Sequence, residues 1–138
     1  MHKIFETYTP KGFSTMNTYL FVNTPEELII FLKEAFLAEE INRTTHDGVI
    51  ANCIMKVGDT CFMISQARGQ FENMRAAHYL FVNDVDAVYQ RAIEYGGRSE
   101  FPPQDMDYND RQAGIVDPCG NYWWISKRLI EKDYHLES

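Results

Sequence analysis

The pentapeptide Tyr-Leu-Phe-Val-Asn occurs twice in this chain, at residues 19–23 and again at residues 79–83. Each copy alternates large apolar side chains as a half-buried strand does, and each precedes a stretch with helical periodicity. A motif that recurs with its surroundings at a fixed separation indicates a repeated structural unit. The chain is therefore predicted to be one module made twice.

The segments that begin at each copy run in the same order of strand, helix and three further strands. In the first module we expect a strand over 15–23, a helix over 25–38, and strands over 41–45, 49–57 and 60–66. In the second we expect a strand over 77–83, a helix from the cap Asp84 through Tyr95, and strands over 98–100, 110–116 and 121–127. The closing strands also repeat, because Met-Ile-Ser at 63–65 corresponds to Trp-Ile-Ser at 124–126.

The module boundaries follow from this register. Module 1 covers about 14–66, a linker 67–75, module 2 about 76–128, and a tail 129–138, all within a single domain. The predicted fold class is α+β, with two tandem β-α-β-β-β modules that form one curved mixed sheet around a cup and carry their helices outside. An irregular loop at 101–109, which contains two prolines, is a candidate flap over this cup.

Local signals fix the start of the first helix. Thr24 stands at the N-cap position, Pro25 at the first helical position, and Glu27 three residues after the cap. This pattern is typical of a capping box, in which the Thr24 hydroxyl accepts a hydrogen bond from the third helical N–H group.

Composition excludes several classes of protein. Hydrophobic residues make up 45% of the 138 residues, which favours a folded domain over a disordered chain. The net charge of −7, without a basic stripe, argues against nucleic-acid binding. No apolar run is long enough for a membrane span, and the N-terminus lacks the apolar region of a signal peptide. Three cysteines without a C-x-x-C pair are typical of free thiols, so we expect a cytoplasmic location.

Two stretches of the second module carry a family resemblance. Residues 78–86 read His-Tyr-Leu-Phe-Val-Asn-Asp-Val-Asp, and residues 110–123 contain Asp-Arg followed by Asp-Pro-Cys-Gly-Asn-Tyr-Trp. With the duplicated module, the chain resembles the vicinal oxygen chelate superfamily (glyoxalase, bleomycin-resistance protein and extradiol dioxygenase), over roughly residues 14–128. Leu37 departs from the resemblance, since such chains often carry glycine at this helix end.

The resemblance implies four positions for metal ligands, one on the first and one on the last strand of each module. In this sequence they are Thr18, Met63, His78 and Trp124. A catalytic divalent metal needs about three protein ligands with hard donors, and only His78 supplies one. We therefore expect no metal and no other cofactor. A divalent ion would need donors from elsewhere, for example Asn52 or a partner chain.

Strand alternation predicts the lining of the cup. If His78 faces inward, Leu80 shares its face, while Tyr79 and Phe81 pack beneath the helix. The last strand of each module and the strand beside it contribute further apolar and aromatic residues to the predicted lining of the cup. Arg111 is a further polar residue that could line it. The predicted ligand-binding residues are Thr18, Asn52, Ile54, Met63, His78, Leu80, Arg111, Tyr122 and Trp124.

Each assignment has a structural alternative. Trp124 either stacks on a ligand or fills the space that a metal would occupy, and Met63 either lines the cup or belongs to the core. His78, the best candidate for a catalytic residue, either contacts a ligand or bonds to Tyr122 or a carbonyl. Arg111 either faces the ligand or pairs with a nearby aspartate.

Three functions remain open. The first is a metal-free protein that binds a small aromatic or amphipathic molecule in the cup and sequesters it. The alternative is a lyase, isomerase or dioxygenase of the same superfamily that uses His78 with an atypical metal site. The third is a non-enzymatic interaction module. The expected partners are a small-molecule ligand and a second copy of the chain in a homodimer.

Overall fold

A computed structural model of the chain describes residues 2–134, and its two halves repeat the same succession of elements. A short 3-10 helix at Lys3–Phe5 precedes them. The first half contains β1 (Tyr19–Val22), α1 (Pro25–Phe36), β2 (Glu39–His46), β3 (Val49–Val57) and β4 (Thr60–Gln66). The second half contains β5 (Ala77–Phe81), α2 (Val85–Glu94), β6 (Arg98–Asp105), β7 (Asp110–Val116) and β8 (Tyr122–Arg128). The predicted β-α-β-β-β order is confirmed in both modules.

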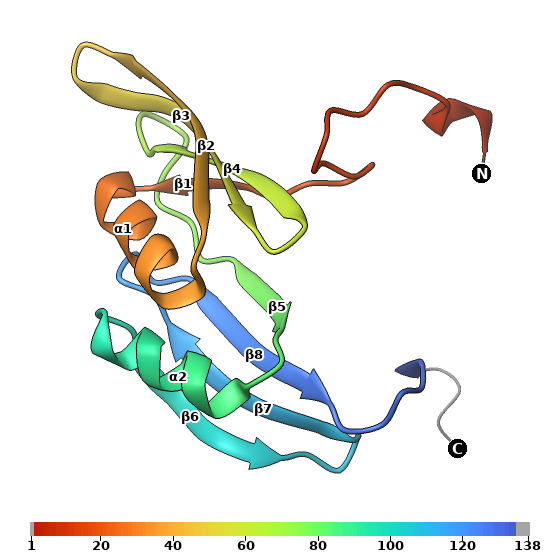
Figure 1. Cartoon of the computed structure of the whole chain (residues 1–138). Helices are drawn as coiled ribbons and strands as arrows, with labels where there is room; N and C mark the ends of the chain where they lie inside the picture. The colour runs from red at the N-terminus through yellow and green to blue at the C-terminus, as the bar shows by residue number, and fades with distance from the viewer. Residues whose placement is uncertain (1, 135–138) are drawn as a thin grey trace.

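The strands form two sheets with identical topology. The first has the order β1-β4-β3-β2 and the second the order β5-β8-β7-β6. In each, the first strand pairs in parallel with the last strand of its module, and the other pairs are antiparallel. The α+β class and the tandem modules are confirmed. The sheets are separate rather than joined into one, so β1 and β5 are both edge strands (Figure 1).

One hydrophobic core serves both modules. Helices α1 and α2 lie next to each other on one side of the molecule (Figure 1), and Arg91 of α2 donates a hydrogen bond to the carbonyl of Glu34 on α1. The ring of Phe36 lies 5.0 Å from that of Trp123, and the ring of Phe62 lies 6.5 Å from it. Because these contacts cross between the modules, the two halves pack as one unit.

Asp117 organises the turn between β7 and β8, in the motif that carried the family resemblance. Its buried carboxylate accepts hydrogen bonds from the backbone N–H of Cys119 (2.8 Å) and of Asn121 (3.1 Å). The indole Nε1–H of Trp123 donates to the second oxygen at 2.8 Å. This side chain therefore fixes both the tight turn and the start of β8.

The two faces of β5 are the reverse of the predicted ones. Leu80 packs against the core, whereas Tyr79 and Phe81 are 46% and 56% exposed on the open face of the sheet. The physical reason is the register, because the parallel ladder pairs Tyr79, not His78, with Trp124. Paired residues share a face, so His78 points to the helix side.

The first module shows the same reversal in β1. Leu20 and Val22 are fully buried, and Tyr19, which pairs with Met63, is 43% exposed. Alternation in β3 is as predicted, because Cys53 and Met55 are fully buried while the intervening residues point away from the core.

Two further local predictions are wrong. The irregular loop predicted over 101–109 is reduced to a turn at 106–109, since β6 extends through Asp105 as an edge strand whose register shifts around the two prolines. Edge strands and register shifts are where proline is tolerated in a sheet. Thr24 makes no side-chain capping bond, and its hydroxyl instead lies 3.3 Å from Cys119 Sγ. Asp84 does cap α2, through the Ala87 N–H at 3.1 Å.

Candidate functional site

The open face of the second sheet is rich in exposed aromatic rings. Tyr79 and Phe81 lie with ring centroids 5.3 Å apart, and Trp124 is paired with Tyr79 across the ladder. The Trp124 ring in turn lies 6.0 Å from Tyr122 and 6.1 Å from Phe101. Because these rings face away from the core, they form a half-exposed aromatic platform, which we call the aromatic face.

A buried charge lies at one end of this aromatic face. Asp110 is fully buried and forms a 2.9 Å ion pair with Arg128. Its other oxygen accepts hydrogen bonds from the hydroxyls of Tyr79 and, at 2.7 Å, of Tyr134. The Arg128 guanidinium also lies 4.3 Å over the Tyr134 ring. The cluster thus attaches the chain after β8 to the aromatic face.

A second polar pair follows along the same face. Gln112 is fully buried and donates to the Ser126 hydroxyl at 2.7 Å, while the Tyr108 hydroxyl donates to its side-chain oxygen. These bonds satisfy the buried amide. The face therefore combines apolar rings with a few fixed polar groups, the usual composition of a small-molecule site.

The cluster keeps Asp110 ionised. Burial by itself would raise the pKa of this carboxyl, but hydrogen bonds from Tyr79, Tyr134 and Arg128 outweigh it and lower the pKa below its ordinary value. Burial raises the pKa of Tyr134, and its bond to Asp110 raises it further. The two shifts act together, because an ionised Asp110 is the better acceptor for the neutral Tyr134 hydroxyl.

The first sheet presents a smaller open face of the same kind. Tyr19 and Phe21 have ring centroids 4.9 Å apart, and Phe71 of the linker lies 5.4 Å from Phe21. Met63 pairs with Tyr19 on one side and with Ile54 on the other. The predicted residues Asn52, Ile54 and Met63 therefore lie on this face, which is a different sheet from that of Tyr122 and Trp124.

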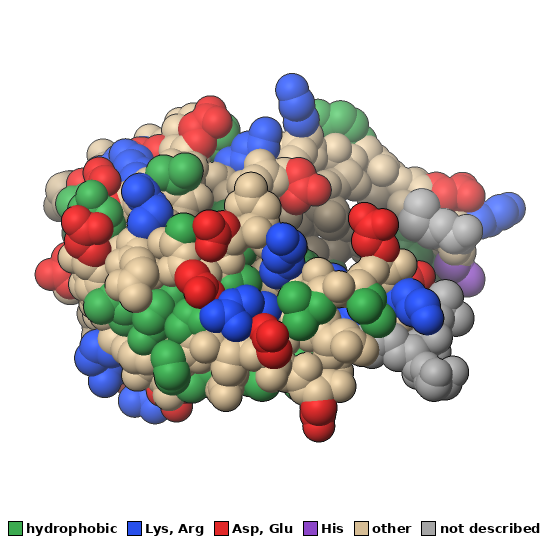
Figure 2. All heavy atoms as spheres, turned by 60° about the horizontal axis from the view of Figure 1, so that its bottom comes forward, with side chains coloured by type: hydrophobic (Ala, Val, Ile, Leu, Met, Phe, Trp, Pro, Cys, Tyr) green, Lys and Arg blue, Asp and Glu red, His purple; other side chains and the backbone are tan. Residues whose placement is uncertain are grey.

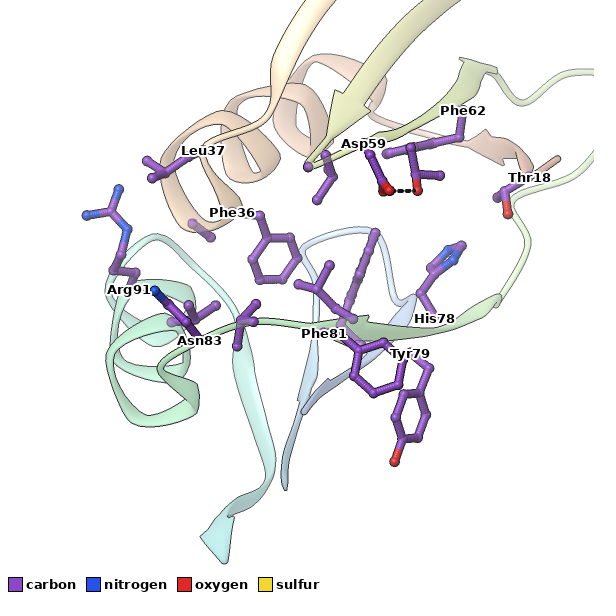
Figure 3. A pocket seen from close by; sticks show the side chains of 18 residues that line it. Thr18, Phe36, Leu37, Asp59, Phe62, His78, Tyr79, Phe81, Asn83 and Arg91 are labelled. Carbon is purple, nitrogen blue, oxygen red and sulfur yellow. Dashed lines mark hydrogen bonds between the residues drawn. The ribbon is translucent and has the colours of Figure 1, made fainter. Parts of the chain in front are cut away.

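A groove of about 510 Å³ lies between the modules on the helix side of β5. Three predicted site residues line it, Thr18, His78 and Leu80, together with residues that were not predicted to belong to a site (Figure 3). The His78 ring stacks 4.3 Å from Trp123, and its Nε2 atom is buried without a hydrogen-bond partner. Burial lowers the pKa of His78, which favours the neutral imidazole.

Arg111 lies outside these surfaces. Its guanidinium pairs with Asp86 at 2.8 Å and with Asp105 at 2.9 Å, so the expected pairing with an aspartate is found, though not with Asp110 or Asp117. These bonds raise the pKa of Arg111 and hold it on the α2 side of the sheet.

The positions implied for a metal do not converge. His78 and Trp124 point to opposite faces of the second sheet, and Thr18 and Met63 belong to the first module. Within residues 2–134, no group of three His, Cys, Asp or Glu side chains could hold a metal ion. Among the described side chains His78 therefore belongs to no such three-ligand group, and the residues do not fit the ion that metal-using relatives bind.

The fold and these surfaces can be compared with known proteins. The sequence profile of the Glyoxalase/Bleomycin resistance protein/Dioxygenase superfamily matches residues 14–125. The chain belongs to this superfamily. The duplicated motif and the Asp-Pro-Cys-Gly turn are thus features of a shared fold, and the resemblance inferred from the sequence is confirmed.

Relatives in this superfamily are distant. An uncharacterised protein of Mycobacterium bovis is 25% identical, with 84% of each chain covered. The crystal structure of TioX from Micromonospora sp. ML1 has a TM-score of 0.72 at 21% identity, covering 83% of this chain and 98% of that one. TnmS3, an antibiotic binding protein from Streptomyces sp. CB03234, has a TM-score of 0.68 at 18% identity, covering 88% and 97%. At these identities the structures show a common fold.

The sequence analysis missed the residues that give the aromatic face its character. Tyr79 and Phe81 were assigned to the core, and Asp110, Arg128 and Tyr134 were not selected. One signal was available, because both pentapeptide copies place aliphatic Leu and Val on one face and aromatic Tyr and Phe on the other. Aliphatic residues are the more usual occupants of a full core. No local pattern joins Asp110 to Arg128, which meet only across the β7–β8 ladder.

The outer surface carries charges of both signs. In Figure 2, acidic and basic side chains are interspersed with apolar ones on the face shown, and the described residues there form no continuous basic stripe. None of the helices within the described residues is long and apolar enough to cross a membrane.

Proposed function

We propose that this protein binds a small aromatic or amphipathic molecule on the aromatic face, without a metal, and acts by holding it. The observation that carries the proposal is the half-exposure of Tyr79 and Phe81 beside Trp124, next to a buried and fully bonded Asp110. Flat rings offer stacking area for a planar ligand on this face. The antibiotic-binding relative TnmS3 supports the same kind of function.

We further propose that a second copy of the chain covers the rest of this surface. The exposed aromatic side chains include Tyr19, Phe71, Tyr79 and Phe81. Apolar surface of this kind, shared between two sheets of one chain, indicates an interaction site, and a homodimer would place one chain's open face opposite another's. A ligand would then lie between rings from both subunits.

Thermal denaturation with a panel of planar aromatic antibiotics tests the proposal. A ligand present at 100 times its Kd stabilises the folded state by about 2.7 kcal/mol, which is a readily measured shift in melting temperature. We expect at least one planar compound to give such a shift and to quench the fluorescence of Trp124. The Trp124→Leu variant should weaken binding by about fivefold, since stacking on an aromatic ring contributes about 1 kcal/mol.

Arg111→Gln serves as the matched control, because Arg111 is bonded to Asp86 and Asp105 away from the aromatic face. It should bind like the wild type. If every compound that binds does so equally well to the Trp124→Leu variant, the aromatic face is not the ligand site. If addition of divalent metal is required for binding, the metal-free proposal is wrong.

A further inference from the structure

We propose that the groove between the two modules is a second small-molecule site, which takes a neutral aromatic compound carrying a hydrogen-bond acceptor. It lies on the opposite side of β5 from the aromatic face. Every residue of β5 from His78 to Phe81 borders the groove, but the rings of Tyr79 and Phe81 point away from it onto the aromatic face, whereas His78 points into it (Figure 3). The inference therefore does not depend on the proposed function.

The walls of the groove are aromatic side chains from both modules. Phe36 at the end of α1 and Phe62 of β4 come from the first module, and Trp123 of β8 comes from the second. The rings of Phe36 and Phe62 lie 5.0 and 6.5 Å from that of Trp123, and the His78 ring lies 6.4 Å from Phe62. The volume of about 510 Å³ lies within the range of about 300–1,000 Å³ found for ligand pockets.

The His78 side chain is the polar group that would select ligands with a hydrogen-bond acceptor. A neutral imidazole has one N–H donor and one lone-pair acceptor. The buried Nε2 has no partner, and a buried orphan N–H is rarer in proteins than an unpaired acceptor. We therefore place the proton on Nδ1, the ring nitrogen that is not buried, where its N–H can donate to a carbonyl or ether oxygen in the groove.

Two charged side chains also line the groove. The carboxylate of Asp59 accepts a hydrogen bond from the Thr60 hydroxyl at 3.0 Å, and Arg91 of α2 donates to the Glu34 carbonyl (Figure 3). These two side chains have opposite charges and His78 is neutral, so the lining favours neither sign of ligand charge. A net charge on the ligand would thus lose hydration without a matching gain. The free edge of β5 adds unpaired backbone groups along one side.

The two tryptophans make a test that separates this site from the aromatic face. Trp123 lines the groove and Trp124 lies on the aromatic face, so their indole N–H signals in a 1H–15N NMR spectrum report one site each. The probes are 2-acetylnaphthalene and 2-ethylnaphthalene, which match in size but differ in the carbonyl acceptor. We expect 2-acetylnaphthalene to shift the Trp123 signal at lower concentration than the Trp124 signal, and to bind about fivefold more tightly there than 2-ethylnaphthalene.

Variants of His78 extend the test. His78→Gln keeps an N–H donor and should retain the preference for the acetyl compound, whereas His78→Phe should abolish the preference. Equal Trp123 titration curves for the two probes on the wild type would overturn the proposal, even if His78→Phe does not fold. A Trp124 shift without a Trp123 shift would also overturn it while leaving the proposed function intact. A Trp123 shift alone would support the groove and count against the aromatic face.

Discussion

Asp110 shows how one residue supports a whole surface. It is a fully buried carboxylate whose partners come from three segments: Tyr79 of β5, Arg128 of β8 and Tyr134 beyond it. A buried charge is tolerated only when it is paired and hydrogen-bonded, and here both oxygens are used. The cluster therefore positions Tyr79 on the aromatic face and holds the chain end against it.

We predict that Asp110→Asn costs about 3 kcal/mol in the free energy of unfolding at neutral pH, because it removes the buried carboxylate from its ion pair with Arg128. Urea denaturation measures this. The lowered pKa of Asp110 sets the pH dependence: its stabilisation is present above the ordinary value of 3.8 and is lost as the pH falls through the lower folded pKa. The difference between wild type and variant should therefore shrink only below about pH 3.8. A difference that is constant down to pH 2 would contradict this.

Leu37 carries local backbone strain. It lies in the left-handed region with φ of 56°, at the C-cap of α1, and it is 74% exposed. Glycine adopts this conformation without the steric cost of a Cβ atom. We predict that Leu37→Gly raises the free energy of unfolding by about 0.5 kcal/mol, read as a higher urea midpoint. Leu37→Ala is the control and should give no such gain, since alanine keeps the Cβ atom.

At the scale of elements, β5 shows what the sequence could and could not predict. The pentapeptide repeat correctly indicated a strand in each module, and alternation correctly separated Trp123 from Trp124. The face of β5 depended on its register with β8, which is a long-range pairing that no local pattern specifies. The family resemblance implied that His78 faces the cup, and the faces of the other β5 residues were predicted from that position. Because His78 instead points to the helix side, the predicted inward and outward residues of β5 are exchanged.

Strand β6 was predicted too short, ending at residue 100 rather than at Asp105. Two adjacent prolines removed the usual alternation, but the segment still pairs with β7 from Arg98 to Asp105 across two register shifts. Phe101 occupies the space over Gly114, because a Cβ atom at Gly114 would lie 2.5 Å from its ring. The strand is therefore placed by a side chain that packs over a glycine of the neighbouring strand.

We predict that Gly114→Ala displaces Phe101 and costs about 1–3 kcal/mol in the free energy of unfolding, as overpacking does. The emission of Trp124 should change too, since its ring lies 6.1 Å from Phe101. The double variant Gly114→Ala/Phe101→Leu should recover part of the loss, because leucine leaves room for the new methyl group. A double-mutant cycle measures the coupling, and additive effects would show that the two positions do not share this space.

At the scale of the whole molecule, the two modules share one core on their helix sides, and aromatic side chains on both open sheet faces are exposed among the described residues. The single curved sheet expected from the repeat is absent as a hydrogen-bonded unit, because β1 and β5 do not pair. A repeat predicts that two modules are alike but contains no information on which edges or faces meet. The exposed aromatic side chains on the open faces are the reason for proposing that a second copy covers them.

This arrangement predicts a dimer that depends on the open faces. Native mass spectrometry of the wild type should show two chains per particle, and Phe81→Asp should shift the population to monomer, because a carboxylate would be buried between apolar rings. Ile30→Asp is the matched control: Ile30 is 54% exposed, close to the 56% of Phe81, but it lies on α1 away from the open faces. If both variants remain dimeric, the subunits meet elsewhere. If Ile30→Asp alone gives monomer, the helices rather than the sheets form the interface.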